Sequence, residues 1–304
     1  MKSVRVLLLG VAVTGLAGLA YAAPTKLSNI GDSISQGFGA NSIPGDHPDL
    51  SFAQGTSEDV GSLFLRFLAL DPSLTQEPES VSGAELVGGG DSFAAQASRV
   101  CAQAVKPDHV TVMLGGNDVC NRDRSDTADA TANMYSLDTW LNGLRAGLDQ
   151  LAACLPAGAT VHVLSVPRVD FLYEAGHDKS FWCFDIIWPV AGICRIVTAE
   201  DDPARRAQIG ARIDEYNEAT TAELAAYDTN ANGRNPAGLH ILGDWEGSID
   251  DGGENTSIGA FVFGEEDING VDCFHPNTGG QSKLACVAWS STSEGAGEPT
   301  VCLQ

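Results

Sequence analysis

Residues 109–118, with the sequence HVTVMLGGND, indicate the class of fold. A run rich in valine, threonine and other strand-forming residues ends abruptly in Gly115 and Gly116, and the polar pair Asn117-Asp118 follows. A nearly continuous apolar run of this length is typical of a strand that is buried on both faces of a parallel sheet. We therefore predict a central strand at residues 109–114, with polar side chains at its carboxyl end.

Similar short runs recur on both sides of this strand and alternate with helical patterns. Further strands are predicted at residues 27–30, 85–87, 160–166 and 239–242. Helices are predicted at residues 93–104, 137–151 and 278–289, and another begins at Asp202-Pro203 and extends to Leu224. This alternation predicts a three-layer α/β/α sandwich with a central, mostly parallel five-stranded sheet. In such folds ligands bind at the carboxyl edge of the strands.

The first residues have the pattern of a secretory signal peptide. Lys2 and Arg5 precede an uncharged apolar run, and small residues close it near Ala22 and Ala23. We predict a signal peptide at residues 1–23 and a single domain at 24–304, with an apolar insertion at about 171–200. The expected location is secreted, either extracellular or periplasmic, and no later run reaches the roughly 20 apolar residues of a transmembrane anchor.

Charge and cysteine content narrow the possible partners. The formal net charge of −23 makes nucleic acid an unfavourable partner. Eight cysteines in an exported chain predict disulfides, and the absence of paired CxxC motifs argues against structural zinc. About 105 pairings are possible; Cys183–Cys194 and Cys286–Cys302 are two pairs that we expect.

Asp228, Asn230 and Asn232 resemble the start of a calcium loop, but Leu239 stands where that loop needs a glutamate, which favours a plain turn.

Three segments supply the groups of an acyl-transfer site. Ser33 follows the first strand in GDSIS, and Asn117 follows the central strand, where its amide can stabilise an oxyanion. Asp272 stands three residues before His275, a spacing that lets its carboxylate orient the imidazole as a general base. A second Gly-Asp-Ser sequence at residues 90–92 is interpreted as a helix cap at Ser92.

In this order the three segments resemble the SGNH, or GDSL, hydrolase family, from about Leu27 to Trp289. Within it, GGNDVC and DCFHP are most similar to the phospholipase B-like branch. The resemblance implies a flavodoxin-like fold and a catalytic triad of Ser33, Asp272 and His275, with no cofactor and no metal. It also implies an oxyanion hole formed by Ser33, Asn117 and a glycine, for which we choose Gly90, with Gly89 as the alternative.

The expected activity is hydrolysis of carboxylic esters through an acyl-enzyme on Ser33. The substrate is expected to be a small-molecule or lipid ester such as a phospholipid or lysophospholipid, bound with the help of Asp32, Trp182 and Trp188. We expect a monomer that makes transient contact with lipid surfaces. The alternatives are a carbohydrate acetylesterase with the same triad and, from another class, a non-catalytic acidic binding module.

Overall fold

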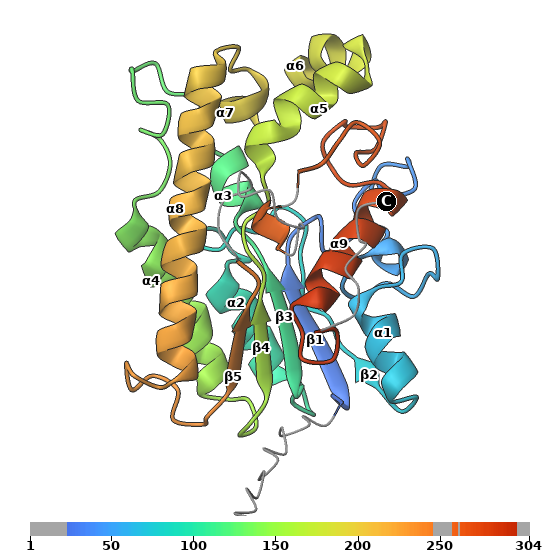
Figure 1. Cartoon of the computed structure of the whole chain (residues 1–304), viewed down its shortest axis with the longest axis vertical. Helices are drawn as coiled ribbons and strands as arrows, with labels where there is room; N and C mark the ends of the chain where they lie inside the picture. Colours follow the sequence, from blue (N-terminus) through green and yellow to red (C-terminus); the bar gives the residue numbers. More distant parts are fainter. Residues whose placement is uncertain (1–22, 246–256, 261, 297–304) are drawn as a thin grey trace, which may run out of the picture.

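A computed structural model describes residues 23–245, 257–260 and 262–296 and has one central sheet (Figure 1). The strands, in the order β2-β1-β3-β4-β5, are all parallel. Their bounds are Lys26–Gly31 (β1), Thr75–Gln76 (β2), His109–Met113 (β3), Thr160–Val163 (β4) and His240–Gly243 (β5). The predicted α/β class and the five-stranded parallel sheet are confirmed. The expected signal peptide lies almost entirely outside the described residues.

One predicted strand is wrong. Residues 85–87 form a loop, in which the backbone N–H groups of Leu86 and Val87 donate to the Asp118 carboxylate at 2.6 and 2.9 Å. The edge strand is instead β2, and the chain after it continues along β1: the N–H of Glu79 donates to the carbonyl of Asn29 at 2.8 Å. Only two residues pair as β2, and both are polar, so no apolar run marks this strand in the sequence.

Helices cover the sheet in two layers (Figure 1). In one layer α4 packs against both α2 and α8, and Trp140 of α4 stacks on Tyr216 of α8 with ring centroids 4.4 Å apart. In the other, α1 packs against α9, where the rings of Phe67 and Trp289 lie 5.0 Å apart. The bounds are Leu63–Leu70 (α1), Phe93–Ala102 (α2), Leu137–Ala152 (α4), Pro203–Asp228 (α8) and Thr278–Ser290 (α9).

The four helices predicted from the sequence are thus confirmed, and two of their caps are as expected. The Ser92 hydroxyl accepts a hydrogen bond from Ala95 N at 3.4 Å, and the Asp202 carboxylate accepts one from Ala204 N at 2.9 Å. Ser92 is therefore the N-cap of α2. Its role differs from that of Ser33, which follows a strand in the other Gly-Asp-Ser sequence.

Shorter helices lie at the carboxyl edge of the sheet, where the expected insertion follows β4. Figure 1 shows α5, α6 and α7 beyond the carboxyl ends of the strands. These elements are Gly116–Cys120 (α3), Leu172–Lys179 (α5), a π-helical turn at Trp182–Ile187 (η3), Trp188–Ala191 (α6) and Arg195–Thr198 (α7). No helix among the described residues has the length and apolar character needed to cross a membrane.

Within residues 23–245, 257–260 and 262–296, three disulfides join elements far apart in the sequence: Cys101–Cys154, Cys120–Cys194 and Cys183–Cys273. The expected pair Cys183–Cys194 is wrong: Cys183 bonds to Cys273 in the loop that carries His275, and Cys194 bonds to Cys120 at the end of α3, so the insertion is not closed on itself. The expected pair Cys286–Cys302 cannot be compared, since residue 302 lies outside the described part of the chain.

Candidate active site

Ser33 lies immediately beyond β1, in a tight turn at the carboxyl edge of the sheet. Gly31 permits this turn, because a Cβ atom at that position would lie 2.1 Å from Ser35 Oγ. The backbone N–H of Phe38 donates to the Ser33 carbonyl at 3.0 Å and closes the loop. The Ser33 side chain is therefore held by the backbone at the point where parallel strands present ligand sites.

The structure brings Ser33, His275 and Asp272 into one hydrogen-bonded chain. His275 Nε2 lies 2.7 Å from Ser33 Oγ, and His275 Nδ1 lies 2.6 Å from Asp272 Oδ2. This is the geometry in which a carboxylate orients an imidazole, and the imidazole can take a proton from a hydroxyl. The three residues come from the two ends of the chain, 242 residues apart in the case of Ser33 and His275.

The Asp272 carboxylate also organises its own loop. Its Oδ1 accepts hydrogen bonds from Phe274 N at 2.9 Å and from His275 N at 3.0 Å. Burial favours the neutral acid, but the hydrogen bonds and charge of His275, together with the two backbone donors, outweigh it and lower the pKa of Asp272. Asp272 is thus an anion at neutral pH and can stabilise a protonated His275.

Asn117 lies in the first turn of α3 and faces the same cavity as Ser33. One N–H of its amide donates to the carbonyl of Ala84 at 2.9 Å, and an amide nitrogen carries a second N–H. The next residue, Asp118, accepts from the loop at residues 86–87, as described above. Asn117 and Asp118 together fix the chain around Gly83 beside the end of β3.

A cavity of about 380 Å³ surrounds these groups. Its lining residues are Ser33, Phe38, Ser82, Gly83, Asn117, Cys120, Asn121, Gly192, Ile193, Cys194, Phe274 and His275. The walls are thus partly apolar, from two phenylalanines and an isoleucine, and partly polar. The Cys120–Cys194 disulfide forms part of the wall and ties α3 to the insertion.

Gly90, the glycine chosen from the sequence, is not among the described residues that line this cavity, and neither is Gly89. Gly83 takes that place, with a φ of +85° that favours glycine. Gly90 was chosen because it follows the strand expected at residues 85–87, which the structure shows to be a loop. A short Ser-Gly-Ala sequence at residues 82–84 gave no pattern that would single out Gly83.

The three residues expected to bind substrate do not line the cavity either. Asp32 is 3% exposed, and its carboxylate accepts a hydrogen bond from Ile34 N at 2.9 Å, so it shapes the Ser33 turn. Burial raises the pKa of Asp32 to about 6. Trp188 is buried, with its indole N–H donating to the Asp272 carbonyl at 3.2 Å, whereas Trp182 points to solvent.

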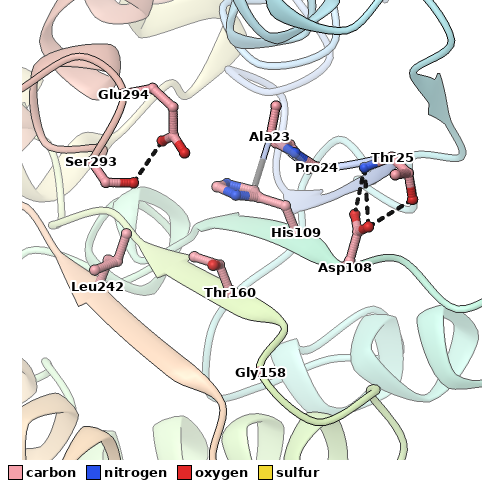
Figure 2. Close-up of a pocket in the computed structure, with 10 residues that line it drawn as sticks. All are labelled: Ala23, Pro24, Thr25, Asp108, His109, Gly158, Thr160, Leu242, Ser293 and Glu294. Atoms are coloured by element: carbon pink, nitrogen blue, oxygen red, sulfur yellow. Dashed lines mark hydrogen bonds between the residues drawn. The ribbon is translucent and has the colours of Figure 1, made fainter. Parts of the chain in front are cut away.

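A second cavity, of about 260 Å³, lies at the opposite edge of the sheet (Figure 2). Figure 2 shows Asp108 accepting hydrogen bonds from Thr25, and Ser293 donating to Glu294 at 2.8 Å rather than to the nearby His109. Deeper in the protein, His162 Nε2 lies 2.8 Å from Ser291 Oγ, but His162 Nδ1 has no partner among the described residues. This serine and histidine pair therefore lacks the orienting carboxylate that His275 has.

The described residues contain no cluster of three or more histidine, cysteine, aspartate or glutamate side chains able to hold a metal ion. In the loop after α8, Asn230 Oδ1 accepts from Asn235 N at 2.9 Å, and the Asn235 amide bonds to the carbonyls of Tyr227 and Leu239. These contacts are those of a self-contained turn.

A parallel sheet with a hydrogen-bonded serine, histidine and aspartate at its carboxyl edge is an arrangement suited to acyl transfer. The model of the GDSL-like lipase/acylhydrolase family matches residues 30–283. The chain belongs to this family, which indicates an ester hydrolase. A search of curated proteins found no match.

Solved structures resemble the chain over most of its length, at low sequence identity. One is a Lactobacillus plantarum protein with 15% identity and a TM-score of 0.43, covering 89% of this chain and 97% of its own. A carbohydrate esterase has 13% identity and a TM-score of 0.39, covering 86% and 66%. A Bacteroides ovatus protein described as a GDSL-like lipase has 13% identity and a TM-score of 0.36, covering 86% and 95%.

Proposed function

We propose that the chain is a secreted carboxylic ester hydrolase whose nucleophile is Ser33. The observation that carries this proposal is the continuous chain of hydrogen bonds from Ser33 Oγ through His275 to Asp272. The intact chain also favours an enzyme over a binding module, because a module that only binds has no need for a serine aligned with an oriented imidazole.

In the proposed reaction, His275 Nε2 takes the Ser33 proton as Ser33 Oγ attacks the ester carbonyl. The carbonyl oxygen becomes an oxyanion, stabilised by the free N–H of Asn117 and by the backbone N–H groups of Ser33 and Gly83. His275 then gives its proton to the leaving alcohol, and an acyl-enzyme on Ser33 remains. Water enters, is deprotonated by His275, attacks the acyl carbonyl and releases the carboxylic acid, while Ser33 regains its proton.

Lipid-type acyl esters are the proposed substrates. The apolar walls formed by Phe38, Ile193 and Phe274 suit a hydrocarbon chain better than a sugar ring, which would need more hydrogen-bonding partners. The similarity of GGNDVC and DCFHP to the phospholipase B-like branch points in the same direction. Three disulfides support the proposed secretion, since such bonds persist in oxidising compartments.

Nitrophenyl esters of graded acyl length test this proposal with the wild type and Ser33→Ala. We expect turnover by the wild type, with an optimum at medium or long chains, and no turnover above background by Ser33→Ala. Activity confined to acetate would favour the carbohydrate acetylesterase instead. Equal activity of the two proteins would remove Ser33 from the mechanism.

A further inference from the structure

The insertion after β4 has an outward apolar side. Four large hydrophobic side chains within ten residues are exposed: Phe181 at 55%, Trp182 at 57%, Ile186 at 43% and Val190 at 84%. We call these four residues the apolar face. Figure 1 places their elements, the segment between α5 and the end of α6, at the outer end of the molecule beyond the carboxyl edge of the sheet. Elsewhere in the described chain, exposed large hydrophobic residues occur singly.

The opposite side of the same segment is well packed. Trp188 packs on α5 so closely that a Cβ atom at Gly176 would lie 2.0 Å from its ring. The rings of Phe184 and His177 stack with centroids 3.9 Å apart. The exposure of the apolar face is therefore a feature of an ordered amphipathic segment whose other side is already packed.

Two disulfides hold the segment in place beside the active site. Cys183 bonds to Cys273, which lies between Asp272 and His275, and Cys194 bonds to Cys120 at the end of α3. A segment joined covalently to the His275 loop and to α3 cannot swing away as a hinged lid does. It presents the apolar face in a fixed position relative to Ser33.

The apolar face continues directly into the wall of the catalytic cavity. The residues that follow Val190 include Gly192 and Ile193, both of which line the cavity with Ser33 and His275. A lipid surface in contact with the apolar face would thus lie at the mouth of that cavity. An acyl ester leaving such a surface would reach Ser33 without first crossing bulk water.

Charge distinguishes between the possible partners. Asp185 is the one charged residue from Phe181 to Cys194, whereas the whole chain has a net charge of −23. This net charge repels an anionic membrane, and it repels a second copy of the chain equally. A neutral or zwitterionic lipid surface carries no such penalty and accepts tryptophan and phenylalanine side chains at its interface.

We propose that the apolar face docks the enzyme on aggregated lipid of zwitterionic or neutral type and so supplies ester substrate to Ser33. This inference rests on the proposed function for its catalytic consequence, but docking itself needs no chemistry. It can be measured with the Ser33→Ala protein, in which no lipid is consumed.

The binding test uses phosphatidylcholine vesicles and Ser33→Ala protein, followed by cosedimentation. We expect binding to weaken at least tenfold when Trp182→Ser and Val190→Ser are added. The matched control is Val105→Ser, which removes an equally apolar side chain that is 66% exposed; the Val105 carbonyl accepts from Lys26 at the start of β1, far from the cavity. The docking proposal would be overturned if the Trp182→Ser/Val190→Ser protein bound vesicles as well as the Val105→Ser control. It would also be overturned if the Ser33→Ala protein itself did not bind vesicles.

Activity assays keep the two proposals separate. With Ser33 present, the Trp182→Ser/Val190→Ser protein should cleave a soluble short-chain nitrophenyl ester at the wild-type rate, which also shows that it folds. Its rate on phosphatidylcholine vesicles should fall at least tenfold. A wild type that fails on the soluble ester contradicts the proposed function, whereas one that cleaves it but ignores vesicles contradicts only the docking. Concentration-dependent dimers that these substitutions abolish would identify a second copy as the occupant and overturn the proposal.

Discussion

Asp272 links the chemistry of the site to the shape of its loop. One carboxylate oxygen receives the imidazole N–H of His275, and the other receives two backbone N–H groups. A neutral side chain of the same shape can preserve the backbone contacts but cannot stabilise an imidazolium. The two roles of this residue can therefore be separated by substitution.

We expect Asp272→Asn to lower kcat by roughly 10³- to 10⁴-fold while the protein stays folded, because an amide N–H opposite His275 Nδ1 favours the wrong tautomer. The measurement is kcat on a soluble nitrophenyl ester, together with the thermal midpoint. A loss smaller than tenfold would show that His275 does not need this carboxylate.

Gly83 and Gly89 form a natural pair for testing the oxyanion hole. Both have a positive φ, +85° and +77°, and a Cβ atom would meet nothing within 4 Å at either position. Alanine should therefore strain the backbone similarly at both, costing about 1 kcal/mol or more of stability. Only Gly83 lines the cavity with Ser33.

We expect Gly83→Ala to lower kcat at least tenfold and Gly89→Ala to leave it within about twofold of the wild type, since only the first displaces the proposed oxyanion donor. Steady-state kinetics and thermal unfolding of both variants provide the comparison. The reverse order of effects would return the oxyanion role to the glycines at 88–90.

At the scale of elements, the Cys183–Cys273 disulfide joins the insertion to the His275 loop. Cys273 has a φ of +56°, a left-handed conformation that is unfavourable for a residue with a side chain. The disulfide and the Trp188 hydrogen bond to Asp272 both fix this loop from the insertion side. The insertion therefore positions His275, the proposed general base, as well as bordering the cavity.

Replacing Cys183 and Cys273 by alanine should lower stability by about 2–5 kcal/mol and lower kcat at least tenfold. The matched variant replaces Cys101 and Cys154, whose disulfide joins α2 to the end of α4, remote from the cavity. That variant should lose stability to a similar extent and retain kcat. Chemical denaturation and kinetics would check both, and unchanged kcat in the first variant would limit its disulfide to a stabilising role.

The elements that the sequence predicted well are those with a strong pattern of their own. The strand at 109–113 is buried throughout and reads as an apolar run, and the helices have repeating apolar faces. By contrast, β2 is polar and short, and it forms a strand only because its backbone pairs with β1. The segment 85–87 has the composition of a strand, but the Asp118 carboxylate takes its N–H groups.

Ser33, Asp272 and His275, which the structure brings together, could be singled out from the sequence because each stands in a short motif at a strand end or in a turn. Gly83, Phe38 and Ile193 were not, since they reach the cavity through loops whose paths depend on tertiary contacts. The disulfide partners were unpredictable for the same reason. Cys183 and Cys194 are close in sequence, but Cys183 bonds to the distant Cys273 and Cys194 bonds to the distant Cys120.

At the scale of the whole molecule, buried titratable groups set the response of stability to pH. Burial lowers the pKa of His109 to about 4, and burial and the neighbouring His109 lower that of His162 to about 3. As the pH falls below about 6.5, the unfolded chain takes up protons at these positions and the folded chain does not, so stability is lost.

Three buried aspartates have the opposite effect, because burial raises the pKa values of Asp32, Asp118 and Asp244 to about 6, 7 and 6. As the pH rises from about 4 through these values, the unfolded chain releases these protons first, and stability falls.

Substituting His162→Phe isolates one of these contributions. Loss of the hydrogen bond to Ser291 gives an offset that does not depend on the ionisation of residue 162. Below pH 6 the variant should gain stability relative to the wild type by about 1.4 kcal/mol per pH unit, because it has no imidazole to protonate on unfolding. Denaturant unfolding at several values between pH 7 and 5 would measure this difference, and parallel curves would contradict it.

Because all five strands are parallel, the orientation of the protein on a solid support has a practical consequence. All five strands begin at the edge opposite Ser33, and the turn before β4 exposes Ala157 there. A cysteine introduced at Ala157 and coupled to a bead would leave the catalytic mouth facing the reaction medium. Coupling through the segment after α5 would turn that mouth towards the bead, so the choice of tether site alone should decide how much activity an immobilised preparation retains.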